Sequence, residues 1–566
     1  MYIRVTSTPN SPRKSVKIVE GIRHGLKVKQ VMIHHVGVAS NEAEIEKLKI
    51  LGRELIADEL LRRAQSSNQI ELFRNENIAE ITKNIELASI RKRGRKPKTT
   101  LQDIQSGDML SLSDLVETKR VVEGIHEVAG SVYNKFEFDR FLKRKKERDM
   151  MRDLVLLRLA NPASKYATQK ILEKQFSVNH DLDSIYRLMD KIFENIDSIK
   201  KQSFEQTLKR SSDKVDVLFF DCTTLYFEST EVDELRKFGY SKDHRFNTTQ
   251  LVLALATTPD GLPIGYELFE GNKAEVKTLL ECVESWKTLF SIGTVCFVAD
   301  RAMMSDKNLS LLEKRGHKYI VAAKLRSFSD DVKAQILDEK KYTEQEYGKD
   351  PSWVAEFKHG TRRLVVSYKP SRADRDAYQR EQILTKLEKQ IGSDGKTEKL
   401  ISNKGIKKYT TSSSSKTIID EDKITRDAEW DGLHGVISNI WEESGIKLLR
   451  RYGNLWKIEE SFRLNKHTLS MRPIFHFKPE RIKAHIAICY MAFSTLRHME
   501  HIALLTQKVS PQTILSELMS VQASYYADTS TGREYRVPGT FSHAASKIYR
   551  ALRVERRTAA QELKRK

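Results

Sequence analysis

The sequence predicts an α/β protein with a mixed sheet, because apolar strand-like runs and helical patterns alternate after residue 214. "VDVLFFDCTTLYF", "TTQLVLALATT" and "LPIGYELFEG" have the composition of three strands in a meander, the last two joined by a Pro259-Asp260-Gly261 turn. Next come a helical pattern in "NKAEVKTLLECVESWKTLF", a strand in "TVCFVAD", a helix in "SDKNLSLLEKRG" and a strand in "KYIVAAK". This order is typical of a mixed α/β sheet.

The composition is that of a globular protein with several structural units. The chain has 566 residues, of which 39% are hydrophobic and 31% are charged. No apolar run approaches the roughly 18 residues of a membrane helix, and the first residues lack a secretory-signal layout. We therefore expect a cytoplasmic protein with no membrane partner. Four cysteines occur singly, which argues against zinc and disulfides and favours core positions for Cys222, Cys282, Cys296 and Cys489.

Net charge gives the strongest compositional signal. The chain carries 98 Lys and Arg residues against 77 Asp and Glu, a formal net charge of +21. Such an excess is typical of proteins that bind polyphosphates such as DNA. The alternative is a basic surface that serves solubility only.

Residues 1–100 contain a predicted hairpin, a helix and a basic arm. Apolar and polar residues alternate over 14–36 on both sides of a His24-Gly25 turn. The arm "IRKRGRKPKTT" has six basic residues around Gly94 and Pro97, and it resembles an AT-hook minor-groove arm. That resemblance assigns DNA contacts to Arg93, Arg95 and Lys96. A solvated linker is the alternative.

Residues 101–210 are predicted to be helical. Asn161-Pro162 breaks the pattern, and Ser164 is positioned to cap the helix that follows. Three short helices with polar turns fit a DNA-binding unit of the helix-turn-helix type, or a packing unit without DNA contact. The sheet region is predicted over 211–325 and again over 431–510. A polar, β-rich insertion is predicted over 326–430, and a basic helical tail over 511–566.

Two apolar runs each end on an aspartate, Asp221 in "VLFFDCTT" and Asp300 in "TVCFVADR". An isolated carboxylate removed from water costs several kcal/mol unless it is paired or binds a metal. Two strands of one sheet that each end in an acid can place both acids side by side, and a divalent cation relieves their repulsion. Mg²⁺ prefers such oxygen ligands, and two ions can serve phosphoryl transfer.

A third carboxylate is predicted in "YGNLWKIEESFRLNK". Tyr452, Glu459 and Lys466 are seven residues apart, so on one helix they share a face. Glu460 points about 100° away from Glu459 and is the fallback ligand.

A strand aspartate, a second strand aspartate and a helix glutamate on a mixed sheet together resemble the RNase H-like core of DDE transposases. More narrowly, Tyr452, Glu459 and Lys466 resemble the Tyr-x2-Arg-x3-Glu-x6-Lys signature of bacterial insertion sequences of the insertion-sequence-four superfamily. "VADRAMMS", "GYSKDHR" and "RPIFHFKPERIKAHI" resemble further segments of that family. The signature arginine is replaced by Leu455, and Arg451 and Lys457 are the nearby cations that could substitute for it.

The resemblance implies a transposase that cleaves DNA at the ends of its element and joins the freed 3′-hydroxyl to target DNA. It implies two Mg²⁺ ions (with Mn²⁺ as an alternative) bound by Asp221, Asp300 and Glu459, and a homodimer that brings two DNA ends together. Tyr452 and Lys466 are then DNA contacts. Charge and location add three phosphate-contact hypotheses, Arg463, Lys242 and Arg245, and Arg301 is expected to be a further DNA contact.

Less specific interpretations of the same residues remain open. Taken alone, each acid is more often a salt-bridged structural residue than a catalytic one. His434 and His476 are expected to be core or hydrogen-bonding histidines, and Trp456 and Phe462 packing aromatics. Two other functions also remain: a DNA-binding protein that has lost catalysis, and a metal-dependent nuclease that cuts without joining.

Overall fold

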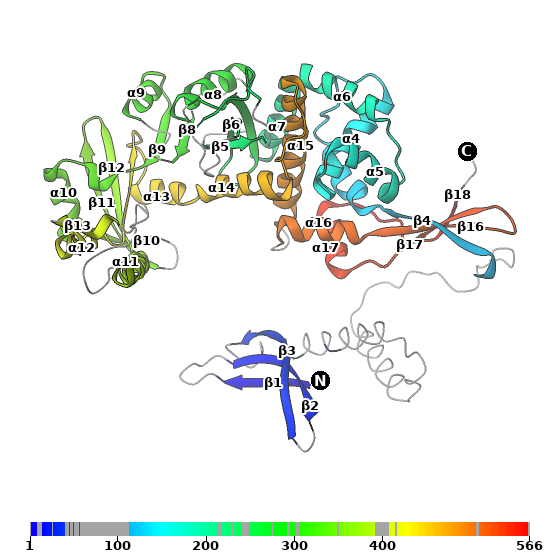
Figure 1. The fold of residues 1–566 in the computed structure, drawn as a ribbon, viewed down its shortest axis with the longest axis horizontal. Coiled ribbons are helices and arrows are strands. Elements are labelled where there is room, and N and C mark those ends of the chain that lie inside the picture. The colour runs from blue at the N-terminus through cyan, green and yellow to red at the C-terminus, as the bar shows by residue number, and fades with distance from the viewer. Residues whose placement is uncertain are drawn as a thin grey trace. The chain divides into compact units, whose positions relative to one another are not determined.

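The computed structural model describes most of the chain beyond residue 111 and selected segments before it. The described residues are 2–7, 14–24, 27–39, 45, 49, 56, 112–211, 217–227, 231–239, 248–273, 275–290, 295–300, 305–347, 350–390, 407–413, 416–504 and 509–563. The chain divides into two compact units, Met1–Met109 and Leu110–Lys566, each described by itself (Figure 1).

The first unit contains a three-stranded antiparallel sheet, β1 (Tyr2–Ser7), β2 (Lys14–His24) and β3 (Lys27–Ala39). β2 and β3 pair up to His24 and Lys27, so the predicted hairpin is confirmed. Val16 and Ile18 on β2 are buried, as the alternation predicts. The basic arm with Arg93, Arg95 and Lys96 lies outside the described residues.

A nine-stranded mixed sheet forms the centre of the second unit, in the order β10-β11-β12-β15-β9-β8-β5-β6-β7. Five of its strands form the predicted core: β5 (Val217–Tyr226), β6 (Gln250–Thr257), β7 (Pro263–Glu270), β8 (Cys296–Ala299) and β9 (Lys318–Ala322). β5, β6 and β7 form an antiparallel meander, and β8 and β9 follow parallel to β5. Three antiparallel strands followed by two parallel ones are the arrangement of an RNase H-like core, which confirms the predicted fold class.

Helices cover both faces of this core. α8 (Glu275–Phe290) and α9 (Asp306–Lys314) pack on one face, where Phe220, Phe297 and Trp286 are buried. The other face carries Phe219 and Val298 and is covered by α13 (Gly445–Gly453) and α14 (Trp456–Arg463). The strands therefore read as continuous apolar runs, because both faces are buried.

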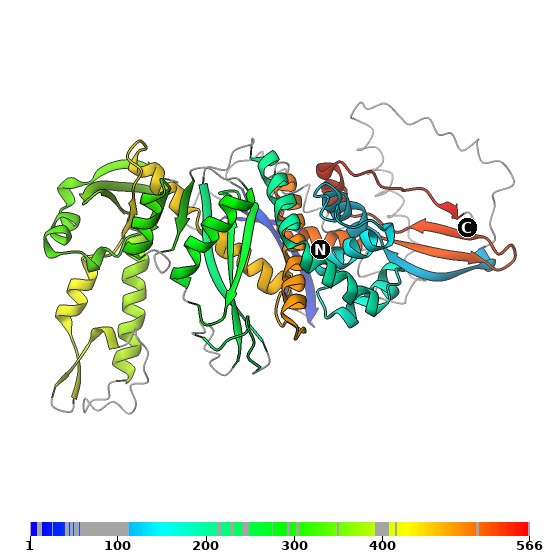
Figure 2. The same cartoon turned by 90° about the horizontal axis from the view of Figure 1, so that it is seen from above.

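The β-rich insertion predicted over 326–430 contains three strands that extend the same sheet beyond β9, and a fourth such strand follows just after residue 430. They are β10 (Thr343–Tyr347), β11 (Asp350–His359), β12 (Arg362–Tyr368) and β15 (Leu433–Ser438). The sequence between them forms α11 (Pro370–Gln390), η6 (Lys407–Tyr409), β13 (Thr410–Ser413), β14 (Lys416–Ile419) and α12 (Glu421–Ala428). α11 and the β13–β14 hairpin extend away from the sheet (Figure 2). Before β10 lie η4 (Leu325–Ser327), α10 (Asp330–Leu337) and η5 (Glu339–Lys341).

The predicted helical region is also confirmed. It comprises η2 (Ile125–Ala129), α3 (Gly130–Asn134), α4 (Lys145–Ala160), α5 (Lys165–Phe176), α6 (Leu182–Glu194) and α7 (Ile196–Arg210). The Ser164 side chain accepts a hydrogen bond from the Ala167 backbone N–H and caps α5, as predicted. α15 (Pro479–Leu504) packs against α4, α6 and α7 and also contacts β7. One hydrophobic core therefore continues from these helices through α15 to the sheet.

The C-terminal residues differ from the predicted helical tail. α16 (Pro511–Ser520) and α17 (His543–Leu552) are helical, but β16 (Gln522–Asp528), β17 (Glu534–Pro538) and β18 (Gln561–Leu563) are strands. β4 (Leu115–Val122), which follows η1 (Leu112–Asp114), completes their four-stranded antiparallel sheet. β4 and β16 lie some 400 residues apart in the sequence, and local pattern does not reveal such a pairing.

The search for membrane-spanning segments covered the described residues. None of their helices combines the length and apolar character that crossing a bilayer requires.

Arg363 on β12 connects the insertion to the segment that leads into α13. Its guanidinium is buried and donates to the carboxylate of Glu356 and to the backbone carbonyls of Ile440 and Glu443, at 3.1 and 2.5 Å. The other carboxylate oxygen of Glu356 accepts the backbone N–H of Gly445 at 2.9 Å, at the first residue of α13.

Replacing Arg363 with alanine leaves the partly exposed carboxylate of Glu356 and two backbone carbonyls without their donor. We expect Arg363→Ala to lower the free energy of unfolding by about 2–4 kcal/mol, measured by urea denaturation. Lys358→Ala, at an exposed position on the neighbouring strand β11, is the matched control and should change it by less than about 0.5 kcal/mol. Equal effects of the two variants would contradict the role assigned to Arg363.

Candidate active site

Asp221 and Asp300 occupy equivalent positions on adjacent parallel strands. The register pairs Val217 with Cys296 and continues one residue at a time to Phe220 with Ala299. The next position on each chain is Asp221 and Asp300. Neighbouring strands lie about 5 Å apart, so the backbone brings the two carboxylates together.

Side-chain alternation places both carboxylates on the same face of the sheet. Phe219 and Val298 face the core that α14 covers, and the residues two positions further along are Asp221 and Asp300. One detail of the prediction is wrong, because β5 does not end at Asp221 but continues to Tyr226. It is the neighbouring strand β8 that ends, at Ala299, and this opens the sheet beside Asp221.

The two carboxylates differ in exposure. Asp221 is half-buried, and its Oδ1 accepts a hydrogen bond from the Cys222 backbone N–H at 2.7 Å. Asp300 is exposed at the end of β8. The pair therefore lies at an opening of the sheet rather than in its sealed interior, and solvent or a ligand reaches it from the Asp300 side.

The helix expected over Tyr452–Lys466 is divided into three parts. α13 ends at Gly453, a turn follows, α14 begins at Trp456, and η7 (Leu464–Thr468) is a π-helical turn. Gly453 and Asn454 have weak helix propensity, which accounts for the interruption. Tyr452, Glu459 and Lys466 therefore lie on separate elements, and the seven-residue spacing does not by itself put all three on one face.

Contacts of α14 distinguish Glu459 from Glu460. On one side of the helix, Lys457 Nζ donates to the Pro259 carbonyl at 2.6 Å, at the β6–β7 turn. Glu460 is also engaged, with Arg463 at 3.3 Å and Arg497 at 3.9 Å. Glu459 lies about 160° around the helix from Lys457 and is exposed. This orientation favours Glu459 over Glu460 as the third carboxylate.

The three carboxylates are not gathered around one point in this structure. Among the residues that the structure describes, no three His, Cys, Asp or Glu side chains lie close enough together to hold a metal ion. Asp221 and Asp300 are paired by the sheet, whereas Glu459 lines a pocket of about 290 Å³ between α14 and the insertion. We call this space the Glu459 pocket; its other polar lining residues are Ser367, Lys369, Arg372, His434, Tyr452 and Trp456.

Sequence reasoning missed the role of His434 in this pocket. The ring centroids of His434 and Tyr452 are 5.3 Å apart. Burial, and then the positive charges of Arg372 and Lys369, lower the pKa of His434 to about 4, so its imidazole is neutral at pH 7. Arg372, Lys369 and His434 come from the insertion, and no local motif links them to Glu459.

The residues around the missing signature arginine have other partners. Leu455 is buried at the edge of the core and also lines the Glu459 pocket. Arg451 pairs with Glu443 at 2.7 Å, and Lys457 binds the β6–β7 turn, so neither cation replaces the arginine here. Phe462 is buried as predicted, but Trp456 is 54% exposed and lines the pocket, so its prediction as a packing aromatic is wrong.

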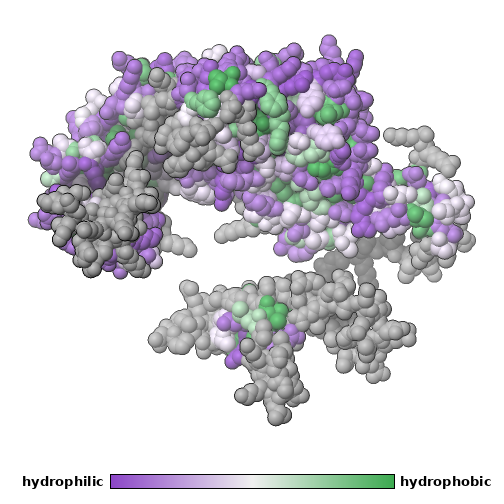
Figure 3. Space-filling model, viewed as in Figure 1, coloured by the Kyte–Doolittle hydropathy of each residue, from purple (hydrophilic) through white to green (hydrophobic). Residues whose placement is uncertain are grey.

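The remaining predicted DNA contacts are described only in part. Arg463 is exposed and pairs with Glu460, and Lys466 is half-buried in η7. Arg301, Lys242 and Arg245 lie outside the described residues. The described face of the second unit in Figure 3 is mainly hydrophilic, with hydrophobic residues in small patches.

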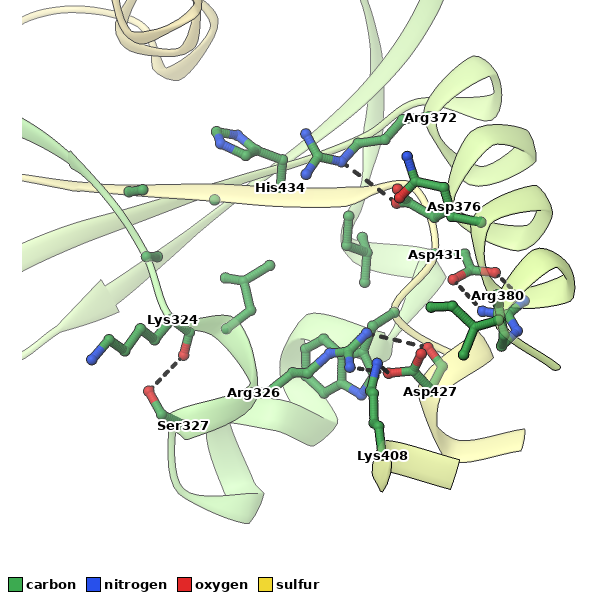
Figure 4. A pocket seen from close by; sticks show the side chains of 18 of the residues that line it. Lys324, Arg326, Ser327, Arg372, Asp376, Arg380, Lys408, Asp427, Asp431 and His434 are labelled. Atoms are coloured by element: carbon green, nitrogen blue, oxygen red, sulfur yellow. Dashed lines mark hydrogen bonds and ion pairs between the residues drawn. The ribbon is translucent and has the colours of Figure 1, made fainter. Parts of the chain in front are cut away.

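A larger pocket of about 640 Å³ adjoins the Glu459 pocket and shares Arg372 and His434 with it. Figure 4 shows the Arg372 side chain extending from α11 toward His434. The acids of this larger pocket are paired within it. Asp431 binds Arg380 through two hydrogen bonds of 2.7 and 2.5 Å, and Asp427 binds Arg326 and Lys408.

Comparisons with known proteins find one matching family model and similar solved structures. Residues 213–494 match the family model described as the transposase DDE domain, a segment that contains Asp221, Asp300 and Glu459. No curated protein matches the chain. Among solved structures, the chain is similar to the piggyBac transposase synaptic complex with hairpin DNA, at 10% identity and a TM-score of 0.35, covering 70% of this chain and 77% of that one. It is also similar to the Mos1 transposase paired-end complex with the left transposon end, at 14% identity and a TM-score of 0.14, covering 32% and 58%.

The pKa of His434 tests the geometry of the Glu459 pocket. Arg372→Gln removes a positive charge that disfavours the imidazolium, so we expect the pKa of His434 to rise from about 4 toward its ordinary value. Burial persists in the variant, so the rise should be partial. Titration of ¹³C-labelled histidine by NMR measures it, with exposed Arg375→Gln as the control. An unchanged pKa in Arg372→Gln would show that the two side chains are not close.

Proposed function

We propose that this protein is a DDE transposase that binds the ends of its insertion sequence and catalyses DNA cleavage and strand transfer. One observation carries the proposal. The parallel register of β5 and β8 places Asp221 and Asp300 side by side on the sheet face that α14 covers, within a segment matching the transposase DDE domain. The catalytic residues in this proposal are Asp221, Asp300 and Glu459.

The two aspartates suit a hard divalent cation such as Mg²⁺, or Mn²⁺ in its place. Mg²⁺ is commonly bound by one or two carboxylates together with substrate phosphates, and Asp300 leaves the site open to such a substrate. When bound, the ions supply an activated attacking oxygen and stabilise the leaving oxygen. Glu459 would be the third carboxylate of this ligand set.

The finer assignment is to the insertion-sequence-four superfamily with the Tyr-Arg-Glu-Lys signature. Tyr452, Glu459 and Lys466 support it, and Leu455 departs from it. In this assignment Tyr452, Lys466 and Arg463 contact DNA near the cleaved bond, together with Arg301, Lys242 and Arg245. Double-stranded DNA of the terminal repeats and target is the partner, the basic arm and the helices α4–α7 contribute to end binding, and a homodimer holds two ends.

A second candidate is a DNA-binding protein on the same scaffold without catalysis. Two observations favour it: Leu455 brings no charge to the pocket, and Glu459 lies apart from the aspartates in this structure. A nuclease that cuts without joining is a third. Incubation with Mg²⁺ and duplexes carrying the inverted repeats that flank the gene separates the three. Joined products indicate a transposase, cleavage alone a nuclease, and a mobility shift alone a binding protein.

Loss of any one carboxylate should remove catalysis and leave binding intact. We expect Asp221→Asn, Asp300→Asn and Glu459→Gln each to slow end cleavage by more than about 100-fold, with little change in DNA affinity. Glu460→Gln is the matched control, because Glu460 pairs with Arg463 and should be dispensable for cleavage. If Glu459→Gln cleaved at a near-normal rate and Glu460→Gln lost cleavage, Glu460 rather than Glu459 would be the catalytic glutamate.

A further inference from the structure

The Glu459 pocket combines an unpaired acid with cations from a different part of the chain. Glu459 makes no hydrogen bond or ion pair with any other side chain in the described part of the structure, although it shares a pocket with Lys369 and Arg372. In the adjoining larger pocket, by contrast, Asp427 and Asp431 are neutralised by direct ion pairs. The cations and the acid of the Glu459 pocket are therefore arranged around a space rather than against each other.

Arg372 is only partly neutralised by its own neighbours. Its Nε is buried and has no hydrogen-bond partner among the described residues, and the nearest carboxylate oxygen, on Asp376, is 3.6 Å away. Asp376 also accepts the Gly432 backbone N–H at 3.2 Å. A guanidinium that keeps N–H groups outside its ion pair can bind a phosphate through them, because two parallel N–H groups match two phosphate oxygens.

The local field in the pocket is positive on the insertion side. Lys369 lies directly before α11, a helix of 21 residues whose positive end starts at Pro370. His434 is neutral at pH 7, and Tyr452 adds a hydroxyl without charge. Leu455 contributes only apolar surface. All positive charge of the pocket therefore comes from the insertion, and all of its negative charge comes from Glu459.

We propose that Lys369 and Arg372, with His434 and Tyr452 beside them, bind one phosphodiester of the DNA strand next to Glu459. The insertion thereby holds the strand in position against α14, because neither Lys457 nor Arg463 of α14 lines the pocket. Lys369 and Arg372 are positioning residues in this account, and the proposal rests on the proposed function as a DNA-processing enzyme. The phosphate would accept from the Arg372 guanidinium and the Lys369 ammonium, and the aromatic side chains of Tyr452 and Trp456 would flank the attached nucleoside.

Methylphosphonate substitution tests this contact at single-phosphate resolution. The probe is an end duplex carrying the flanking inverted repeat, in a series with one uncharged methylphosphonate at each successive position. Affinity is measured by fluorescence anisotropy in Ca²⁺, and end cleavage in Mg²⁺. We expect Arg372→Ala to weaken binding about tenfold, and one methylphosphonate position to weaken binding of the unaltered protein similarly. Combining the two should give no further loss, because both remove the same contact.

Matched variants separate this role from general effects on charge and folding. Arg375→Ala removes an exposed arginine from the same helix and should leave affinity and cleavage near normal. Arg372→Lys keeps the charge but not the two-pronged geometry, and should fall between Arg372→Ala and the unaltered protein. Thermal unfolding of Arg372→Ala and Arg375→Ala should coincide.

Three results would overturn the inference. They are unchanged affinity and cleavage in Arg372→Ala, an equal loss in Arg375→Ala, or additive losses for Arg372→Ala at every methylphosphonate position. In each case the unaltered protein still binds and cleaves the end duplex, so the proposed function stands. If the unaltered protein neither binds nor cleaves that duplex, the proposed function and the inference fail together.

Discussion

The parallel pairing of β5 with β8 is the constraint on which the site depends. It runs in unbroken register from Val217 and Cys296 to Phe220 and Ala299, so the next residue on each chain is an aspartate. Two carboxylates held close together repel each other, and a cation between them relieves that repulsion. The strands stay paired despite this repulsion because both faces of the sheet are buried in hydrophobic cores. Phe219 packs in one core and Phe220 in the other. The carboxylate pair is thus a consequence of the sheet rather than of local loops.

Much of this arrangement could be predicted from the sequence, because its signals are local. Apolar runs predicted the strands. Asp221 and Asp300 were predicted as site residues because each is the acid at the end of such a run. The strand-like run "VDVLFFDCTTLYF" includes all of β5 up to Tyr226, whereas the interpretation of Asp221 as the end of a strand is wrong. The division of the helix at Gly453 and Asn454 was also missed, although both residues have low helix propensity. The seven-residue spacing of Tyr452, Glu459 and Lys466 led instead to the prediction of one continuous helix.

The features that sequence reasoning could not reach are all non-local. β4 pairs with β16 across most of the chain, and His434, Lys369 and Arg372 meet Glu459 only because β12 and β15 extend the core sheet toward α13 and α14. This extension connects the insertion to α13, the helix that precedes α14 and Glu459. Arg363 donates a hydrogen bond to the Glu443 carbonyl just before α13, and Glu356 accepts one from the backbone N–H of Gly445, the first residue of α13. Leu455 replaces the arginine of the family signature, so the sequence alone indicates the loss of a positive charge. In the structure, Lys369 and Arg372 of the insertion line the same pocket as Leu455.

The central claim is that Asp221 and Asp300, joined by Glu459 on DNA, bind the same divalent ion. Iron-directed backbone cleavage tests it most directly. Fe²⁺ takes the place of Mg²⁺, and ascorbate with peroxide then generates radicals that cut the polypeptide near the ion. The account predicts cuts close to residues 221 and 300 in the free protein, an additional cut close to 459 with end DNA bound, and suppression of all three by excess Mg²⁺. Cuts confined to other parts of the chain, or a DNA-bound pattern without the cut near 459, would contradict it.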